Sequence, residues 1–377
     1  MGTLSRLHAI GAERPGRMSH HQRIRYLQTS DGVKLAWTET GTGPLLVKAS
    51  NWLTHLEYDW ESPIWSHWLQ FLGERFRFVR YDERGCGMSD WNVDNLSLDR
   101  RLEDLEAVIE AAGIREPVAL LGISQGASIC IAYAVRHPDR VSRMVLYGGY
   151  ARGSLRRGDA EQDRMYRAVV DLIRVGWAQD NPAFRQVFTS RFIPGASDEQ
   201  VKWFNELCRK TSSPVAAAAL LESRGVIDVM ELLPQVQTPT LILHGRNDEV
   251  VPIAEGRLLA ASIRGAQFVE LESRNHVLLE GEPAWPRFCE EVAEFLGVAT
   301  PAVEDGAFAS LSPREREILG RLTEGLSNAE IAERLGVSEK TVRNHLSNLF
   351  DKLGVWSRAQ AMVLARDRGF KDDRSAR

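Results

Sequence analysis

The chain has 377 residues, of which 44% are hydrophobic and 26% are charged. This length favours two or three domains, because a single core rarely grows beyond about 250–300 residues. The composition excludes a disordered or collagen-like chain. The 47 Lys and Arg residues nearly balance 51 Asp and Glu residues, giving a formal net charge of −4, so the average charge does not indicate a polyanionic partner.

The four cysteines are widely spaced, and no Cys or His pair has the spacing of zinc ligands. We therefore expect reduced thiols in a cytoplasmic protein that holds no metal and no cofactor. No run approaches the roughly 18 apolar residues of a membrane span, so we expect no membrane partner. Residues 1–22 lack the apolar stretch of a secretory signal, and we interpret them as a flexible tail.

Short β-type runs alternate with amphipathic segments between residues 23 and 297, which predicts a layered α/β domain. Ser30-Asp31-Gly32 joins the first two runs as a hairpin turn, whereas helix-length segments separate the later runs. This order predicts an antiparallel start followed by a mostly parallel sheet covered on both faces. The predicted strands are residues 24–29, 33–39, 45–49, 76–82, 117–122, 141–148, 240–245 and 267–271.

The strand pattern stops between about residues 150 and 232. This segment is rich in helix-forming sequence and carries scattered aromatic residues, among them Trp177, Phe188, Phe192, Trp203 and Phe204. We interpret it as a helical cap over the edge of the sheet. Its aromatic content favours an apolar or aromatic ligand.

A candidate nucleophile lies in the sequence G-I-S-Q-G at residues 122–126, between a predicted strand and a helix predicted over residues 127–136. Glycines here permit a tight, strained turn that presents Ser124 near a helix N-terminus. A serine needs a base and an orienting carboxylate, and Asp248 and His276 follow later strands in the required order. The alternatives are an ordinary glycine-rich turn and an isolated structural histidine.

Together these segments resemble the α/β-hydrolase fold over residues 24–297. The sequence D-E-R-G-C-G-M-S at residues 82–89 is similar to the D-x-R-G-x-G-x-S segment of many members. The resemblance implies a catalytic triad of Ser124, Asp248 and His276, and an oxyanion hole formed by the backbone N–H groups of Trp52 and Gln125. The loop at residues 50–52 departs from the usual His-Gly pair of the family, since it reads Ser-Asn-Trp.

That loop continues into an unusually aromatic stretch. Either the aromatic side chains pack the loop against the sheet, or they form a wall of a ligand pocket, and the sequence alone leaves both alternatives open. The residues concerned are Trp52, His55, Tyr58, Trp60 and Trp65.

Residues 298–309 are small and flexible in composition and predict a linker. A second domain is predicted over residues 310–371. Ser312 and Ser327 are each followed three positions later by Glu, which predicts capping boxes at the starts of two helices. Gly325 and Gly336 predict the ends of these helices. A third helix begins near Ser338, and a fourth spans residues 357–367.

The third of these helices is amphipathic. Its predicted buried stripe consists of Val342, Leu346, Leu349 and Leu353. Its opposite face carries Lys340, Arg343, Asn344 and Ser347. Such a face can read bases in a DNA major groove, although charge alone favours the alternative, a solvated face of a small helical interaction module.

Residues 312–361 closely resemble the LuxR-type helix-turn-helix domain, so we expect an all-α, four-helix DNA-binding domain after the α/β-hydrolase domain. The resemblance implies a homodimer on double-stranded DNA. It also implies base contacts from Arg343, Asn344 and Ser347 and phosphate contacts at or beside Lys340, Thr341, His345 and Lys352. Residues 338–371 hold seven Lys or Arg against three Asp or Glu, a local basic patch that the average charge conceals.

We therefore expect a ligand-responsive transcriptional regulator. Its hydrolase-like domain is expected to bind a small apolar or aromatic ester, lactone or amide, with or without hydrolysing it. The alternative is a catalytically active serine hydrolase in which the helical C-terminal domain is only an oligomerisation module.

Overall fold

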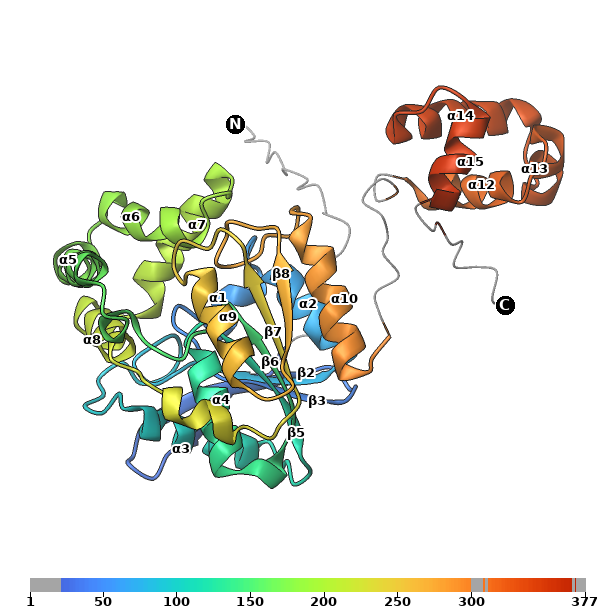
Figure 1. Cartoon of the computed structure of the whole chain (residues 1–377). Helices are drawn as coiled ribbons and strands as arrows, with labels where there is room; N and C mark the ends of the chain where they lie inside the picture. Colours follow the sequence, from blue (N-terminus) through green and yellow to red (C-terminus); the bar gives the residue numbers. More distant parts are fainter. Residues whose placement is uncertain (1–21, 300–307, 309–310, 368–369, 371–377) are drawn as a thin grey trace, which may run out of the picture. The chain divides into compact units, whose positions relative to one another are not determined.

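The computed structural model describes residues 22–299, 308, 311–367 and 370 (Figure 1). The chain divides into two compact units, Met1–Val298 and Ala299–Arg377. The predicted N-terminal tail lies outside the described residues except for Gln22. The predicted linker does so as well, except for residues 298, 299 and 308. None of the described helices combines the length and the apolar character needed to cross a bilayer.

The first unit is built on an eight-stranded sheet in the order β1-β2-β4-β3-β5-β6-β7-β8. The β1–β2 and β2–β4 pairs are antiparallel and all later pairs are parallel, which confirms the predicted mostly parallel α/β sheet. All eight predicted strands are present, with ends that differ by one residue at most. They are β1 (Arg25–Gln28), β2 (Lys34–Thr40), β3 (Leu45–Lys48), β4 (Arg77–Tyr81), β5 (Val118–Ile123), β6 (Val141–Tyr147), β7 (Thr240–Gly245) and β8 (Gln267–Leu271).

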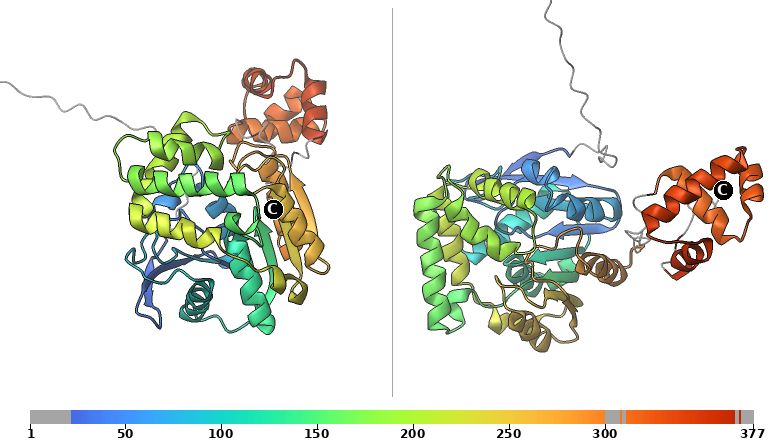
Figure 2. Two further views of the ribbon diagram at one scale, coloured as in Figure 1. Left: turned by 60° about the vertical axis from the view of Figure 1, so that its left-hand side comes forward. Right: turned by 90° about the horizontal axis from the view of Figure 1, so that it is seen from above.

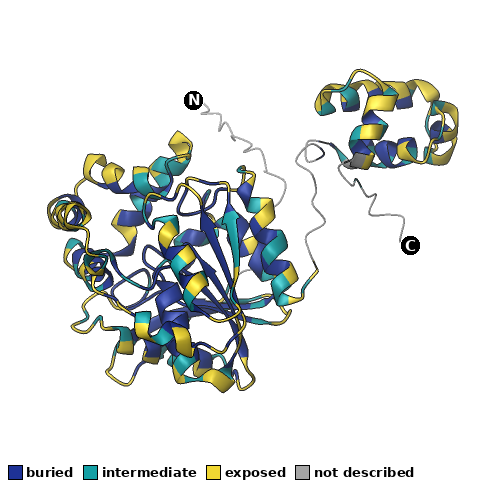
Figure 3. Ribbon diagram, viewed as in Figure 1, coloured by how far each residue is buried: buried dark blue, intermediate teal, exposed yellow. Residues whose placement is uncertain are grey.

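Helices cover both faces of this sheet because its central strands are apolar on both sides. Along β5, Leu120 belongs to one buried cluster and Leu121 to the other, as the alternation of side chains in a strand requires. Figure 3 shows the central strands buried between the helical layers. The helices α2 (Ser66–Arg75) and α10 (Ala284–Leu296) lie on one face, and α3 (Leu98–Ala111), α4 (Gly126–Arg136) and α9 (Ile253–Ser262) lie on the other.

Four further helices fill the segment between β6 and β7 and gather at one end of the sheet (Figure 2). Their inner faces bury Trp177, Phe188 and Phe204, whereas Met165 and Val187 are exposed on the outside. The helices are α5 (Ala160–Gly176), α6 (Ala183–Phe192), α7 (Asp198–Thr211) and α8 (Pro214–Gly225).

The second unit is helical, with its own apolar core. Ser312 and Ser327 each accept a hydrogen bond from the backbone three residues on, and the Glu there bonds back, so both predicted capping boxes are present. Gly336 ends its helix in a left-handed conformation at φ 63°, which a residue with a Cβ adopts only at a cost. The helices are α12 (Pro313–Thr323), α13 (Asn328–Leu335), α14 (Glu339–Leu353) and α15 (Arg358–Asp367).

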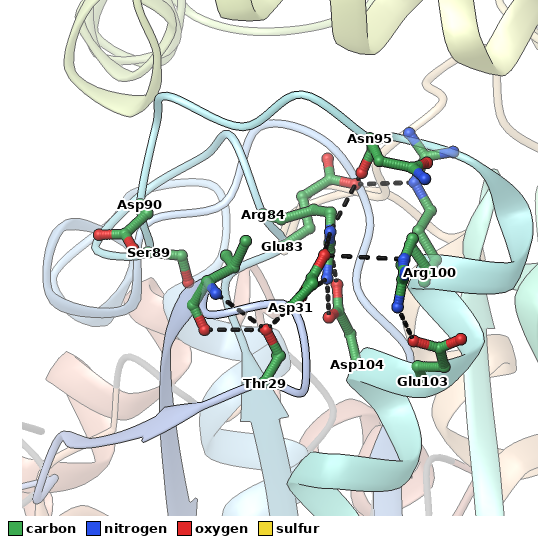
Figure 4. A network of polar contacts seen from close by, with 12 residues as sticks. Thr29, Asp31, Glu83, Arg84, Ser89, Asp90, Asn95, Arg100, Glu103 and Asp104 are labelled. Atoms are coloured by element: carbon green, nitrogen blue, oxygen red, sulfur yellow. Dashed lines mark hydrogen bonds and ion pairs between the residues drawn. The ribbon is translucent and has the colours of Figure 1, made fainter.

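A buried ion pair joins the loop after β4 to α3. Both side chains of the pair, Arg84 and Asp104, are 1% exposed. Arg84 donates to the two carboxylate oxygens of Asp104 at 2.7 and 2.6 Å, and also to Asp31 in the β1–β2 turn at 2.8 Å. Figure 4 shows Arg84 between these two carboxylates. The guanidinium therefore holds together three segments that are distant in sequence.

We predict that Asp104→Ala lowers the free energy of unfolding by about 3–5 kcal/mol, because it leaves a buried guanidinium short of its partner. The matched control is Glu103→Ala, which removes a half-exposed ion pair with Arg100 and should cost less than about 1 kcal/mol. Urea denaturation followed by tryptophan fluorescence measures both, since nine of the ten tryptophans precede residue 299. Equal losses of unfolding free energy in the two variants would contradict the role assigned to the buried pair of Arg84 and Asp104.

Candidate functional site

Ser124 occupies a strained turn between β5 and α4. Its φ is +54°, a left-handed value that, among the described non-glycine residues, is shared only with Leu53. A Cβ at Gly122 would lie 2.7 Å from the Cα of Ala127, so only glycine allows the strand and helix to approach this closely. The turn has the strand-to-helix geometry that exposes a nucleophilic serine at the end of a sheet.

Asp248 and His276 meet beyond the ends of β7 and β8. Oδ2 of Asp248 lies 2.6 Å from Nδ1 of His276, and Oδ1 accepts hydrogen bonds from the Val250 and Val251 N–H groups. Burial by itself raises the pKa of Asp248. His276 and the Val251 N–H outweigh this effect, and the pKa of the carboxyl is lowered. In the tautomer with the proton on Nδ1, the ring donates a hydrogen bond to this carboxylate and Nε2 is the acceptor.

Nε2 of His276 is buried and has no hydrogen-bond partner in the described part of the chain. His276 and Ser124 line the same cavity. Looser contact between nucleophile and base is usual before a substrate binds. The structure therefore brings the three predicted triad residues to one place, with the basic nitrogen unpaired.

The two predicted oxyanion residues line this cavity as well. Gln125 immediately precedes α4, where backbone N–H groups lack partners within the helix, and its side-chain amide donates to Glu83 at 3.1 Å. Trp52 lies in the loop after β3. Lys48, the last residue of β3, donates to the Asn51 side chain, which in turn donates to the Trp52 carbonyl at 3.1 Å. The oxyanion role of both N–H groups stays a prediction.

The aromatic stretch after β3 divides between the two alternatives. Trp52 and Trp65 line the cavity, and Trp52 also stacks on Trp177 of the cap at 5.6 Å. Tyr58 instead stacks on Trp203 of α7 at 4.6 Å. Trp52 thus both packs against the cap and lines the pocket, Trp65 lines the pocket, and Tyr58 packs against α7.

The cavity lies between the strand ends and the cap, and it is mainly apolar. Three polar residues of its lining were not predicted from the sequence: Ser154, Arg157 and Arg224. Only Arg224 leaves a signal in the sequence, because it is an arginine within the mainly apolar helix α8. The complete lining is Asn51, Trp52, Leu53, Trp65, Ile123, Ser124, Gln125, Tyr150, Ser154, Arg157, Tyr166, Phe192, Phe204, Leu221, Arg224, Val250, Val251, His276 and Val277. The described residues contain no group of three or more His, Cys, Asp or Glu that could hold a metal ion.

In the second unit, α14 presents the predicted base-facing residues. Arg343, Asn344 and Ser347 are exposed, on the face away from the buried Val342 and Leu346. Arg343 pairs with Glu339 one turn earlier at 2.9 Å, and both side chains are about half exposed. Such an exposed pair is weak and can be exchanged for another partner.

The predicted phosphate-contacting residues are placed less uniformly. Lys340 is exposed, whereas Thr341 and His345 are half-buried. The ammonium group of Lys352 lies 2.7 Å from the carboxylate of Glu315, the capping-box residue of α12. Burial by itself raises the pKa of Glu315, but Lys352 and Ser312 outweigh it and lower the pKa. Lys352 therefore takes part in the packing of α14 against α12.

Comparison with known families assigns each of the two units to a family. Residues 58–283 match the model described as "alpha/beta hydrolase fold", and residues 309–365 match "Bacterial regulatory proteins, luxR family". The chain belongs to the α/β-hydrolase family, and it carries a LuxR-type helix-turn-helix domain at its C-terminal end. This domain implies DNA binding, and the fusion suggests a transcriptional regulator.

Individual relatives match one unit or the other. The AB hydrolase superfamily protein YisY of Bacillus subtilis is 26% identical over 254 residues, covering 67% of this chain and 91% of that protein. A hydrolase structure from Pseudomonas aeruginosa is 27% identical with a TM-score of 0.60, covering 73% of this chain and 98% of its own. The probable HTH-type transcriptional regulator GfsR of Streptomyces halstedii is 57% identical over 54 residues, which are 14% of this chain and 22% of that regulator.

We predict that a fluorophosphonate probe labels the protein at Ser124, because the unpaired Nε2 of His276 can take the hydroxyl proton. Ser124→Ala should abolish labelling. Asp248→Asn should slow it by about 10⁴-fold, since the imidazole then loses the required tautomer. Peptide mapping by mass spectrometry identifies the site. The control Ser154→Ala removes another hydroxyl of the cavity lining and should leave labelling intact. Labelling that survives in Ser124→Ala would contradict the assignment.

Proposed function

We propose that the protein is a DNA-binding transcriptional regulator that responds to a small molecule bound in the Ser124 cavity. One observation carries the proposal. A single chain joins a hydrolase unit, whose cavity contains Ser124 and His276, to a LuxR-type unit that exposes Arg343 and Asn344. A purely metabolic hydrolase has no use for a base-reading helix, and a regulator needs a site that senses a signal.

The cavity is proposed to bind and hydrolyse an ester, lactone or amide with an apolar or aromatic part. Ser124 Oγ attacks the carbonyl carbon while Nε2 of His276 takes its proton, and Asp248 stabilises the imidazolium. The N–H groups of Trp52 and Gln125 hold the oxyanion. The leaving group departs with the proton from His276, and water then releases the acid from Ser124 by the same steps.

DNA binding is assigned to α14. Arg343, Asn344 and Ser347 contact bases in the major groove, and Lys340, Thr341 and His345 contact or flank phosphates. Lys352 is held by Glu315, so we assign it a smaller share of the phosphate contacts. The family resemblance supports a homodimer on an inverted repeat.

We predict that Arg343→Ala weakens binding to the preferred DNA by about 1–3 kcal/mol, or roughly 5- to 150-fold, if Arg343 forms a bidentate base contact. The preferred DNA is selected by the wild-type protein from a random pool or taken from its own upstream region. Gel-shift titration measures the affinity of the protein for specific and for non-specific DNA in parallel. Arg343→Ala should reduce the ratio between the affinity for the preferred DNA and the affinity for non-specific DNA.

Lys340→Ala on the same helix is the matched control. Loss of a phosphate contact should weaken binding to the preferred and the non-specific DNA alike. It should also reduce the slope of log Kd against log salt concentration by about one, the share of a single phosphate contact. Specific binding unchanged by Arg343→Ala would overturn the assignment of α14. A wild-type protein with no sequence-specific complex at all would favour the alternative, in which the helical unit only oligomerises a serine hydrolase.

A further inference from the structure

The wall of the Ser124 cavity is positively charged. Arg157 and Arg224 both line it, and none of the described lining residues is an aspartate or a glutamate. Asp248 lies behind His276 and is engaged by its ring and by two backbone N–H groups. A ligand in this cavity therefore meets guanidinium groups with no competing carboxylate on the cavity surface.

Arg224 is the more deeply placed of the two arginines. It lies near the end of the apolar helix α8 and is only 4% exposed. Its Nη2 donates to Glu83, but its Nε and Nη1 are buried and have no hydrogen-bond partner among the residues that the structure describes. Buried charged donors without partners are costly, so these N–H groups are a place where a further acceptor stabilises the protein.

The carboxylate that Arg224 uses is already shared. Glu83 is fully buried, and its other oxygen accepts from the side chain of Gln125 at 3.1 Å and lies 3.6 Å from the guanidinium of Arg101. One negative charge thus serves two buried guanidiniums. Glu83 also links Arg224 to Gln125, the residue next to the nucleophile, which places Arg224 beside the reacting end of the cavity.

Arg157 likewise shares its neighbouring carboxylate with a second arginine. Its Nε donates to the Arg152 carbonyl at 3.0 Å and lies 3.6 Å from Glu255, and Arg152 lies at the same distance from that carboxylate. Two carboxylates are therefore shared among four guanidiniums. Neighbouring Tyr150 is affected by this charge: burial raises the pKa of its hydroxyl, against the lowering effect of three of the guanidiniums.

Aromatic rings cover the faces of the two cavity guanidiniums. The carbon at the centre of the Arg224 guanidinium lies 4.7 Å from the ring centre of Trp52, and that of Arg157 lies 5.4 Å from the ring centre of Tyr150. Stacked guanidiniums keep their N–H donors at the edges, where the oxygens of a planar carboxylate meet them in the same plane.

We infer that the ligand of the Ser124 cavity carries a carboxylate, which Arg157 and Arg224 bind. This inference rests on the proposed function, since it takes this cavity as the ligand site, and it narrows the ligand class to anionic molecules with an apolar or aromatic part. The carboxylate supplies the acceptor that Arg224 lacks and offsets the positive charge of the wall.

The test compares benzoate with benzamide, a neutral molecule of nearly the same shape. Binding is measured by tryptophan fluorescence and calorimetry, in wild type and in Ser124→Ala. Benzoate should bind about 10- to 100-fold more tightly than benzamide, the range expected for charge-assisted hydrogen bonds. Because binding is read without turnover, the preference should persist in Ser124→Ala and in a protein that fails to hydrolyse esters or to bind DNA.

Arg157→Gln should remove most of the preference for benzoate. The matched control Arg156→Gln changes the exposed neighbour, which does not line the cavity, and should leave the preference unchanged. Arg224→Gln should act as Arg157→Gln does, provided that circular dichroism shows a folded protein. Equal binding of benzoate and benzamide to wild type would overturn the inference. So would a preference that survives Arg157→Gln, or tighter binding of phenyl phosphate than of benzoate.

Discussion

The site depends on one backbone constraint, the left-handed conformation of Ser124 at the end of β5. The turn persists because its neighbours leave no room to relax. A Cβ at Gly122 would lie 2.7 Å from the backbone of Ala127, and one at Gly149 would lie 2.3 Å from the Ala127 side chain. The buried strands on either side of β5 hold these glycines in place. The energy stored in the turn is therefore supplied by the packing of the whole sheet, as is usual for strained functional residues.

Buried charge is the second organising feature of the hydrolase unit. Glu83 follows β4 and contacts Arg101 of α3, Arg224 of α8 and the Gln125 side chain, so the sheet, the cap and the nucleophile turn share one carboxylate. Such networks cost desolvation energy and contribute more to a defined arrangement than to stability. A ligand that binds to Arg224 competes with Glu83 for the guanidinium. The contacts of Glu83 then change, and with them the surroundings of Gln125. The cap arginine and the nucleophile turn are in this way physically connected.

Much of this architecture could be predicted from sequence because its signals are local. Alternating apolar runs predicted the strands, and Ser312 and Ser327 with their paired glutamates predicted the starts of α12 and α13. Ser124, Asp248 and His276 could be proposed together because each follows a predicted strand, and parallel strand ends meet at one edge of a sheet.

The remaining features depend on contacts between distant segments. Arg224 stacks on Trp52, and Lys352 pairs with Glu315 of another helix. Spacing along α14 indicates only that Lys352 is accessible, and no periodicity in α8 reveals that its arginine is buried beside the cavity. Left-handed backbone at Leu53 likewise has no sequence signal, since leucine rarely adopts it.

The proposed function requires that occupancy of the Ser124 cavity changes DNA binding by the same chain. It is tested most directly by measuring the affinity of the full-length protein for its selected DNA before and after complete modification of Ser124 by a fluorophosphonate, with identically treated Ser124→Ala as the control. We predict a change of at least about fivefold in Kd, the lower end of ordinary coupling between two sites, and no change in the control. Identical affinities of the modified and unmodified protein would contradict it.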